Sequence, residues 1–201
     1  MIKQILFDCG GVLVEMKFKD TMLRISGNNE IADYFIKNIW APGSPWLRYD
    51  RGEIGTAEVL AELKNFMPQE YHRFLEQFVD TWLDALPPMD SMPELIDALH
   101  ERGYPCYLLS NFAERFEEMP DRTPALKKLD GTMVSYQAHM LKPDPAFYLL
   151  AAETFGFKPE ETLFVDDVAA NVEGAKAVGM EGYLFTTPAA FHTYLKQCGI
   201  L

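Results

Sequence analysis

The stretch QILFDCGGVLV (residues 4–14) is an apolar run that stops at one carboxylate, passes two glycines and then resumes. Residues 4–8 have the length and near-continuous hydrophobicity of a strand buried on both faces, as in a parallel sheet. Asp8 would then stand at the carboxyl end of this strand, the edge at which open α/β sheets bind ligands. Gly10 and Gly11 carry no side chains, so we expect a ligand to approach the backbone closely there, with its N–H groups free to bind oxygens.

Four further short apolar runs predict strands at residues 104–110, 133–136, 162–166 and 182–185. Helices are expected between them. Ser91 and Glu94 have the spacing of a capping box that opens a helix ending near residue 103. Asp144 before Pro145 predicts a helix start, and residues 168–178 read as a helix closed by glycine. This alternation predicts an α/β fold with an open, mostly parallel Rossmann-like sheet and helices on both faces.

Residues 18–88 interrupt the alternation, because they contain no convincing strand. Helical periodicity dominates at residues 56–67, where Thr56 reads as the N-cap, and at residues 69–86. The pair Pro87-Pro88 cannot continue a helix and closes the region. We therefore predict an α/β core domain of residues 1–17 and 89–201, and a helical cap domain of residues 18–88 placed as a lid over the ligand edge.

Composition excludes several classes of function. The 201 residues carry a net charge of −12, so the chain would repel nucleic acids and anionic membranes. No apolar stretch approaches a membrane span of about 18 residues. Its three cysteines are far apart and form no zinc-binding or disulfide pattern, and the first residues do not resemble a secretory leader. We expect a cytoplasmic protein that is a monomer or homodimer and binds neither nucleic acid nor membrane.

Polar groups stand at or near the ends of four predicted strands: Asp8, Ser110 with Asn111, Lys142, and the pair Asp166-Asp167. Carboxylates gathered at one place raise each other's pKa, and a hard divalent cation such as Mg²⁺ relieves their repulsion. A bound Mg²⁺ would attract a phosphate, which an ammonium and a hydroxyl could also hold. One carboxylate could then attack phosphorus, and the glycines after Asp8 make it the best candidate.

The segments FDCGGVLV, LLSN, LKPDP and FVDDVAANVEGA resemble, in order and spacing, the four motifs of the haloacid dehalogenase-like superfamily. The resemblance covers the whole chain, and the helical insert sits where that family carries an α-helical cap. It implies that Asp8 is the nucleophile and the Gly10 carbonyl a metal ligand. It also implies that Ser110, Asn111, Lys142 and Gly11 bind the phosphate, with Ser110 and Lys142 catalytic. Asp167 would hold Mg²⁺ directly, and Asp166 directly or through water.

One position departs from the family's phosphatase pattern. Phosphatases of this family usually carry a second Asp two residues after the nucleophile, as general acid, where this chain has Gly10. A branch of the family that includes some sugar-phosphate phosphatases also has Gly-Gly in its first motif, so we expect this chain to be active. The sequence does not identify the proton donor. A cap residue, a water or a substrate group could supply the proton, a role worth roughly 10²–10⁴ in rate.

The leading hypothesis is a Mg²⁺-dependent phosphatase that hydrolyses a small phosphorylated metabolite, for example a sugar phosphate, through an aspartyl phosphate. One alternative is a metal-independent 2-haloacid dehalogenase, which Asp166-Asp167 disfavours. The other is a non-catalytic module that binds a phosphate ligand or a protein. In the segment YDRGEIGTAEV (residues 49–59), Arg51 or Glu53 could reach the substrate, or Gly52 and Gly55 could simply make turns. Asn111 is equally compatible with a phosphate contact and a turn.

Overall fold

The computed structural model describes residues 1–201 and contains one sheet of five parallel strands. The strands run in the spatial order β3-β2-β1-β4-β5, and their bounds are β1 (Gln4–Phe7), β2 (Cys106–Ser110), β3 (Gly131–Val134), β4 (Thr162–Asp166) and β5 (Glu181–Leu184). The central strand is β1, in which Ile5 pairs with Cys106 on one side and Leu163 on the other. From β1 the chain adds β2 and β3 on one side of the sheet and then β4 and β5 on the other. The strand order thus reverses at β1, so the ligand crevice is expected at the carboxyl end of this strand.

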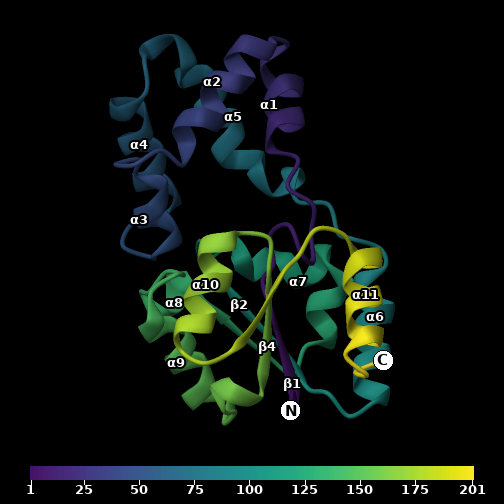
Figure 1. Cartoon of the computed structure of the whole chain (residues 1–201). Coiled ribbons are helices and arrows are strands. Elements are labelled where there is room, and N and C mark those ends of the chain that lie inside the picture. Colours follow the sequence, from purple (N-terminus) through teal and green to yellow (C-terminus); the bar gives the residue numbers. More distant parts are fainter.

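Helices cover both faces of the sheet (Figure 1). One face carries α9 (Pro145–Phe155) and α10 (Ala169–Ala177), and the other carries α6 (Met92–Glu101) and α11 (Pro188–Gln197). Successive side chains of β1 point to opposite faces. Leu6 packs in the cluster of α9 and α10, whereas Ile5 and Phe7 belong to the cluster that includes α6 and α11. The α/β class and the Rossmann-like sheet were therefore predicted correctly.

From Phe18 to Ala85 the chain forms only helices, as predicted. Figure 1 shows them as one group beyond the carboxyl edge of the sheet. Their bounds are α1 (Phe18–Ser26), α2 (Asn29–Ile39), α3 (Trp46–Asp50), α4 (Thr56–Phe66), α5 (His72–Thr81) and the 3₁₀ turns η1 (Gln69–Tyr71) and η2 (Trp82–Ala85). We call residues 18–88 the helical insert; its division from the core as a separate domain stays a prediction.

Two segments join the helical insert to the core, and they run side by side. The N–H of Met89 donates to the carbonyl of Leu13 at 3.0 Å, and that of Glu15 donates to Pro87 at 2.9 Å. One continuous cluster of buried apolar side chains extends from β1 into the insert. The insert is thus packed on the core and not merely tethered to it.

The remaining elements are short, and none of the helices could cross a bilayer. They are η3 (Glu114–Glu118), α7 (Met119–Arg122), η4 (Pro124–Lys128), α8 (Ser135–Ala138) and η5 (Pro159–Glu161).

Three local predictions were wrong. The strand expected at residues 133–136 ends at Val134, because Ser135 begins α8 and its hydroxyl bonds to backbone groups outside the sheet. Ser91 makes no capping hydrogen bond, because its backbone is already helical. Thr56 is the first residue of α4 and not its cap; Gly55 caps the helix, and the Thr56 hydroxyl donates to Glu114 of the core. By contrast, Asp144 caps α9 as predicted, accepting from the N–H of Ala146.

Candidate active site

Five polar side chains named from the sequence meet at the carboxyl edge of the sheet. They come from β1 and the turn after it, the end of β2, the loop before α9 and the end of β4: Asp8, Ser110, Lys142, Asp166 and Asp167. Lys142 joins two of them. Its Nζ lies 2.9 Å from Asp8 Oδ1 and 2.6 Å from Asp166 Oδ2. The site is therefore assembled around one ammonium held between two carboxylates from neighbouring strands.

The Lys142 ammonium is completely buried. Burial alone would lower the pKa of Lys142, but the charges of Asp8 and Asp166 and their hydrogen bonds outweigh it, so the pKa is raised. Lys142 is therefore charged at neutral pH. It is placed to neutralise an anion that approaches Asp8.

Burial dominates the electrostatics of Asp8 despite its lysine partner. Burial raises the pKa of Asp8 to about 7; Lys142 opposes the shift and Asp166 adds to it. One oxygen, Oδ1, accepts the N–H of Cys9 at 2.6 Å and faces Lys142. The Cys9 side chain is in the core, and burial raises its pKa, so it is not a second nucleophile.

Both oxygens of Asp166 are already hydrogen-bonded. Oδ2 accepts from Lys142, Oδ1 accepts the N–H of Val168 at 2.8 Å, and the Asn171 amide lies 3.1 Å from each oxygen. Asp166 is fully buried. Asp166 thus mainly holds the Lys142 ammonium in position and favours its protonated form. Asn171, in the first turn of α10, therefore supports this loop.

Carboxylate oxygens of Asp8, Asp166 and Asp167 lie within 4.8 Å of one another. Asp167 is partly exposed; burial raises its pKa, and the charge of Asp166 adds to this. Three carboxylates against one ammonium leave a net negative charge, and all the donors are hard oxygens. This donor set fits Mg²⁺.

The two glycines after Asp8 serve different needs. Gly11 has φ +70°, and a Cβ built on it would lie 2.1 Å from Asp167 Oδ2, so no other residue fits. Its N–H donates to the Val14 carbonyl at 2.8 Å, and the expected free amide for phosphate is therefore not available at Gly11. At Gly10 the nearest atom to an added Cβ is Met16 Sδ at 3.2 Å, from an exposed, flexible side chain.

Asn111 was expected either to contact phosphate or to make a turn. Its amide nitrogen donates to the Lys142 carbonyl at 3.0 Å, and its oxygen accepts the Lys142 N–H at 2.8 Å. The side chain therefore holds the backbone of Lys142. Asn111 also lines the cavity at Asp8, so its contact with a phosphate stays a prediction.

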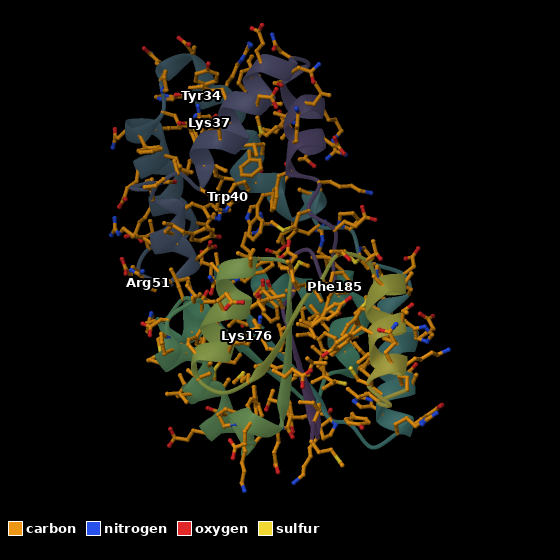
Figure 2. The ribbon with its side chains drawn as sticks, viewed as in Figure 1. Tyr34, Lys37, Trp40, Arg51, Lys176 and Phe185 are labelled. Atoms are coloured by element: carbon orange, nitrogen blue, oxygen red, sulfur yellow. The ribbon has the colours of Figure 1, made fainter.

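A cavity of about 250 Å³ lies between the core and the helical insert. Its polar floor includes Asp8, Ser110 and Lys142, and most of its other lining is aromatic or aliphatic. The apolar walls are formed by Met16, Phe18, Trp40, Trp46, Leu47, Trp82, Leu86, Phe112 and Val168. Figure 2 shows Trp40 on the side of the insert that faces the sheet.

Two residues that line this cavity were not predicted from the sequence. Asp50, at the end of α3, is the one acid that the insert contributes. Trp82 has a buried indole N–H with no hydrogen-bond partner. The segment that contains Asp50 was recognised, but Arg51 and Glu53 were named as its candidates. They pair with each other at 2.7 Å, and neither lines the cavity; Arg51 lies at the outer edge of the insert (Figure 2).

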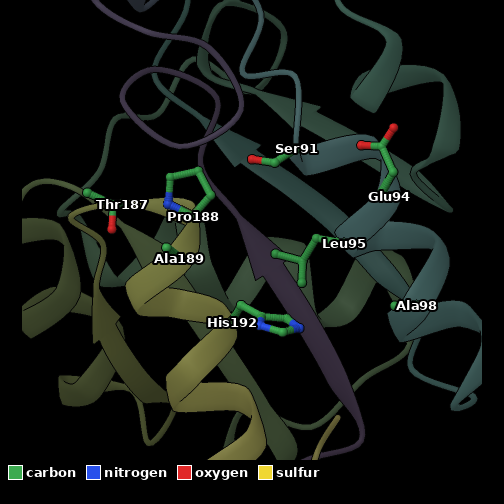
Figure 3. Close-up of a pocket in the computed structure, with 8 residues that line it drawn as sticks. All are labelled: Ser91, Glu94, Leu95, Ala98, Thr187, Pro188, Ala189 and His192. Carbon is green, nitrogen blue, oxygen red and sulfur yellow. The ribbon is translucent and has the colours of Figure 1, made fainter.

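A second hollow, of about 530 Å³, lies between α6 and α11 (Figure 3). It is lined by side chains such as Leu95, Pro188 and His192, and shares no residue with the cavity at Asp8. Its polar side chains are Ser91, Glu94, Thr187 and His192, and no hydrogen bond joins them to one another.

A family model of the haloacid dehalogenase-like hydrolases matches residues 2–179, which is most of the chain. The chain belongs to this family. It is therefore an enzyme of the hydrolase class, as the motif order implied. The matched range includes the segments that carry Asp8, Ser110, Lys142 and Asp166-Asp167.

Members of the family with similar sequences include phosphatases. The chain is 27% identical to the sesquiterpene phosphatase of Aspergillus oryzae over 97% of its own length and 95% of the relative's. It is 28% identical to the D-ribitol-5-phosphate phosphatase of Bacteroides thetaiotaomicron, with 91% of each chain covered. The match to other relatives is shorter: the chain spans 62% of a flavin mononucleotide hydrolase and 60% of a CBBY-like protein, both from Arabidopsis thaliana.

Solved structures of the family share the fold. A family enzyme from Bacteroides thetaiotaomicron, crystallised with magnesium and inorganic phosphate, superposes with a TM-score of 0.72 at 24% identity. The superposition covers 94% of this chain and 96% of that one.

Proposed function

We propose that this hydrolase is a Mg²⁺-dependent phosphatase that cleaves a small phosphate monoester through a phosphoryl group on Asp8. The observation that carries the proposal is the buried Lys142 ammonium between Asp8 and Asp166, with Asp167 beside them. This arrangement places a carboxylate, a fixed positive charge and oxygen donors for a cation at one point. The phosphatases among its relatives support the same activity.

Each residue has a definite task in this proposal. Asp8 attacks phosphorus with the oxygen that does not face Lys142, and the ester oxygen leaves. Lys142 neutralises charge on the phosphoryl oxygens, and the Ser110 hydroxyl, also on the cavity wall, donates to one of them. A water then attacks the phosphoryl group on Asp8, and inorganic phosphate is released.

Asp8, Asp167 and the Gly10 carbonyl would hold Mg²⁺, with Asp166 behind them fixing Lys142. When bound, the cation screens the carboxylates from one another and from the incoming phosphate. The protein side chains alone leave an uncompensated negative charge that would repel a phosphate dianion.

The cavity also constrains the substrate. Its volume, about 250 Å³, is below the roughly 300 Å³ of the smallest sites for drug-sized ligands. Its walls are mainly apolar, and the unpartnered Trp82 N–H offers one donor. These features favour a small leaving group that is largely apolar and carries one acceptor. A sugar phosphate, the example suggested by the sequence, would leave most of its hydroxyls facing apolar walls.

Turnover and metal dependence test the proposal together. Benzyl phosphate suits the apolar walls, and we expect its hydrolysis to require Mg²⁺ and to be lost in Asp8→Asn. Asp167→Asn should also remove the rise in melting temperature that Mg²⁺ alone produces, whereas Asp33→Asn, on the surface of α2, should keep it. Full activity in the presence of a chelator, or halide release from 2-chloropropionate without phosphatase activity, would contradict the proposal.

A further inference from the structure

The proposed phosphatase reaction needs a proton for the leaving group, and the usual donor position holds Gly10. The cavity lining contains few groups that could supply one. Its ionisable side chains are Asp8, Asp50, Lys142 and Asp167. Asp8 is the nucleophile, Lys142 is held charged between two carboxylates, and Asp167 belongs to the cation site. None of the four histidines lines the cavity.

We propose that Asp50 of the helical insert is the general acid and base of this enzyme, replacing the carboxylate that is absent at Gly10. This inference rests on the proposed phosphatase function. Asp50, from α3 of the insert, lines the same cavity as Asp8, Ser110 and Lys142 of the core, so a phosphate held by Ser110 and Lys142 would share this cavity with it. In this position it contacts the substrate without touching the cation site.

The backbone of Asp50 is fixed to the core at the motif that carries Ser110. The hydroxyl of Ser135 donates to the Asp50 carbonyl and accepts the N–H of Phe112 at 2.9 Å. Phe112 is two residues beyond Ser110 and also lines the cavity. One hydroxyl therefore links the end of α3 to the phosphate-binding loop.

A second contact holds the same turn. Gly52 has φ +71°, and an added Cβ would lie 2.2 Å from the Tyr136 carbonyl, so the insert approaches α8 as closely as a glycine allows. The His139 ring nitrogen lies 3.1 Å from the Arg51 carbonyl. Asp50 and the two residues that follow it are thus docked on the core, which gives its carboxyl a defined position.

The surroundings of Asp50 suit a group that both gives and takes a proton. Burial raises its pKa to about 7, while a hydrogen bond from the Trp46 side chain opposes the shift. No ion pair holds it in one state. The charged groups near it are paired with other partners or belong to the floor of the cavity. Arg48 and Arg51 pair with Glu53 on the surface. Glu114 bonds to Thr56, and His139 contacts the Arg51 carbonyl. The charged groups of the cavity floor are Asp8, Lys142 and Asp167.

With Asp50 as the only proton donor and acceptor, both steps of the reaction balance. As Asp8 bonds to phosphorus, the bond between phosphorus and the ester oxygen breaks, and its electron pair stays on that oxygen. The Asp50 proton moves to the oxygen, which leaves as an alcohol, and Asp50 becomes a carboxylate. In the second step Asp50 takes a proton from the water that attacks phosphorus, Asp8 is released, and Asp50 is again protonated.

The rates on two phosphate esters of similar size can distinguish whether Asp50 is an acid catalyst or only a structural residue. Benzyl alkoxide is a strong base that must be protonated as it leaves, whereas 4-nitrophenolate is stable enough to leave without a proton. The ratio kcat/KM reports the steps up to loss of the leaving group. We expect Asp50→Asn to lower kcat/KM for benzyl phosphate by roughly 10²-fold or more, and for 4-nitrophenyl phosphate by less than about tenfold. Asp33→Asn, on the surface of the insert, should change neither.

The outcomes distinguish the two proposals. Equal losses on both esters in an Asp50→Asn variant that keeps the wild-type melting temperature, or no loss on either, would overturn the role of Asp50 while leaving the phosphatase function intact. Failure of the wild-type enzyme with Mg²⁺ to hydrolyse either ester would contradict the phosphatase function and this inference with it. A folding defect in Asp50→Asn would lower both rates together, and Asp50→Glu, which keeps the acid, should then recover benzyl phosphate turnover if the proposal holds.

Discussion

Asn111 and Lys142 are joined by two hydrogen bonds of opposite direction, one from the Asn111 amide to the Lys142 carbonyl and one from the Lys142 N–H to the Asn111 oxygen. The pair ties the loop after β2 to the loop before α9. The bridge therefore fixes the backbone from which the Lys142 ammonium reaches Asp8 and Asp166.

Replacing Asn111 by Ala should therefore reduce catalysis more than stability. A displacement of about 1 Å in a catalytic group can lower the rate by roughly 10²-fold, and we expect a loss between tenfold and that value in kcat/KM. Asn28→Ala is the matched control, because it removes two capping bonds of α2 at a cost of about 1 kcal/mol without touching the site. Equal activities of the two variants would contradict the role given to Asn111.

The two glycines after the nucleophile should differ sharply in their tolerance of a methyl group. Gly11→Ala would place a carbon against the Asp167 carboxylate in a left-handed backbone, so we expect a lower melting temperature and at least a roughly 10²-fold loss of activity. Gly10→Ala meets only the flexible Met16 side chain and should stay close to the wild type in both. Thermal unfolding and steady-state kinetics measure the difference; similar behaviour of the two variants would count against the geometry described for this turn.

Gly10 is also the position at which an added acid could act. Its φ is not in the left-handed region, and Met16 can move away, so Asp is sterically acceptable there. In the Asp50→Asn background, Gly10→Asp should raise kcat/KM for benzyl phosphate by at least about tenfold, because it supplies a new proton donor. Gly10→Asn has the same shape without the proton and should give no rescue. A gain with Asn as large as with Asp would exclude proton transfer as the cause.

Asp50 should also make the stability of the enzyme depend on pH. Its pKa is about 7 in the folded protein, against about 3.9 in an unfolded chain. The folded state thus binds the proton more tightly, and the stability this provides is present below pH 4 and lost as pH rises through 7. Relative to Asp50→Asn, the wild-type free energy of unfolding should fall by on the order of 4 kcal/mol between pH 4 and 9. Urea unfolding of both proteins measures this; a constant difference between them would contradict it.

Much of the fold and the polar floor of the site could be predicted because they follow from local patterns. A strand buried on both faces is continuously apolar, so Asp8 and Asp166 stand out where β1 and β4 end. Ser135 shows the limit of such patterns: its hydroxyl bonds to Asp50 and Phe112, and this contact between distant segments ends β3 early. The role of Asn111 likewise depends on a partner 31 residues away.

Asp50 was not predicted for the same reason. Nothing in YDRGEIGTAEV distinguishes Asp50 from Arg51 and Glu53, because all three are polar residues next to a turn. Docking of α3 on the core directs Asp50 into the cavity and leaves the other two on the surface. Trp82 reads as core in the sequence, and only the packed structure shows that its indole N–H lacks a partner.

The central claim is that Asp8 carries the phosphoryl group during turnover. Acid quenching of the enzyme while it hydrolyses 4-nitrophenyl phosphate with Mg²⁺, followed by mass spectrometry of the peptide that contains residue 8, tests it directly. We expect a peptide heavier by one phosphoryl group, located on Asp8 and absent when the substrate is omitted. Steady turnover with no phosphoryl group on Asp8, or an Asp8→Asn variant that retains full activity, would contradict it.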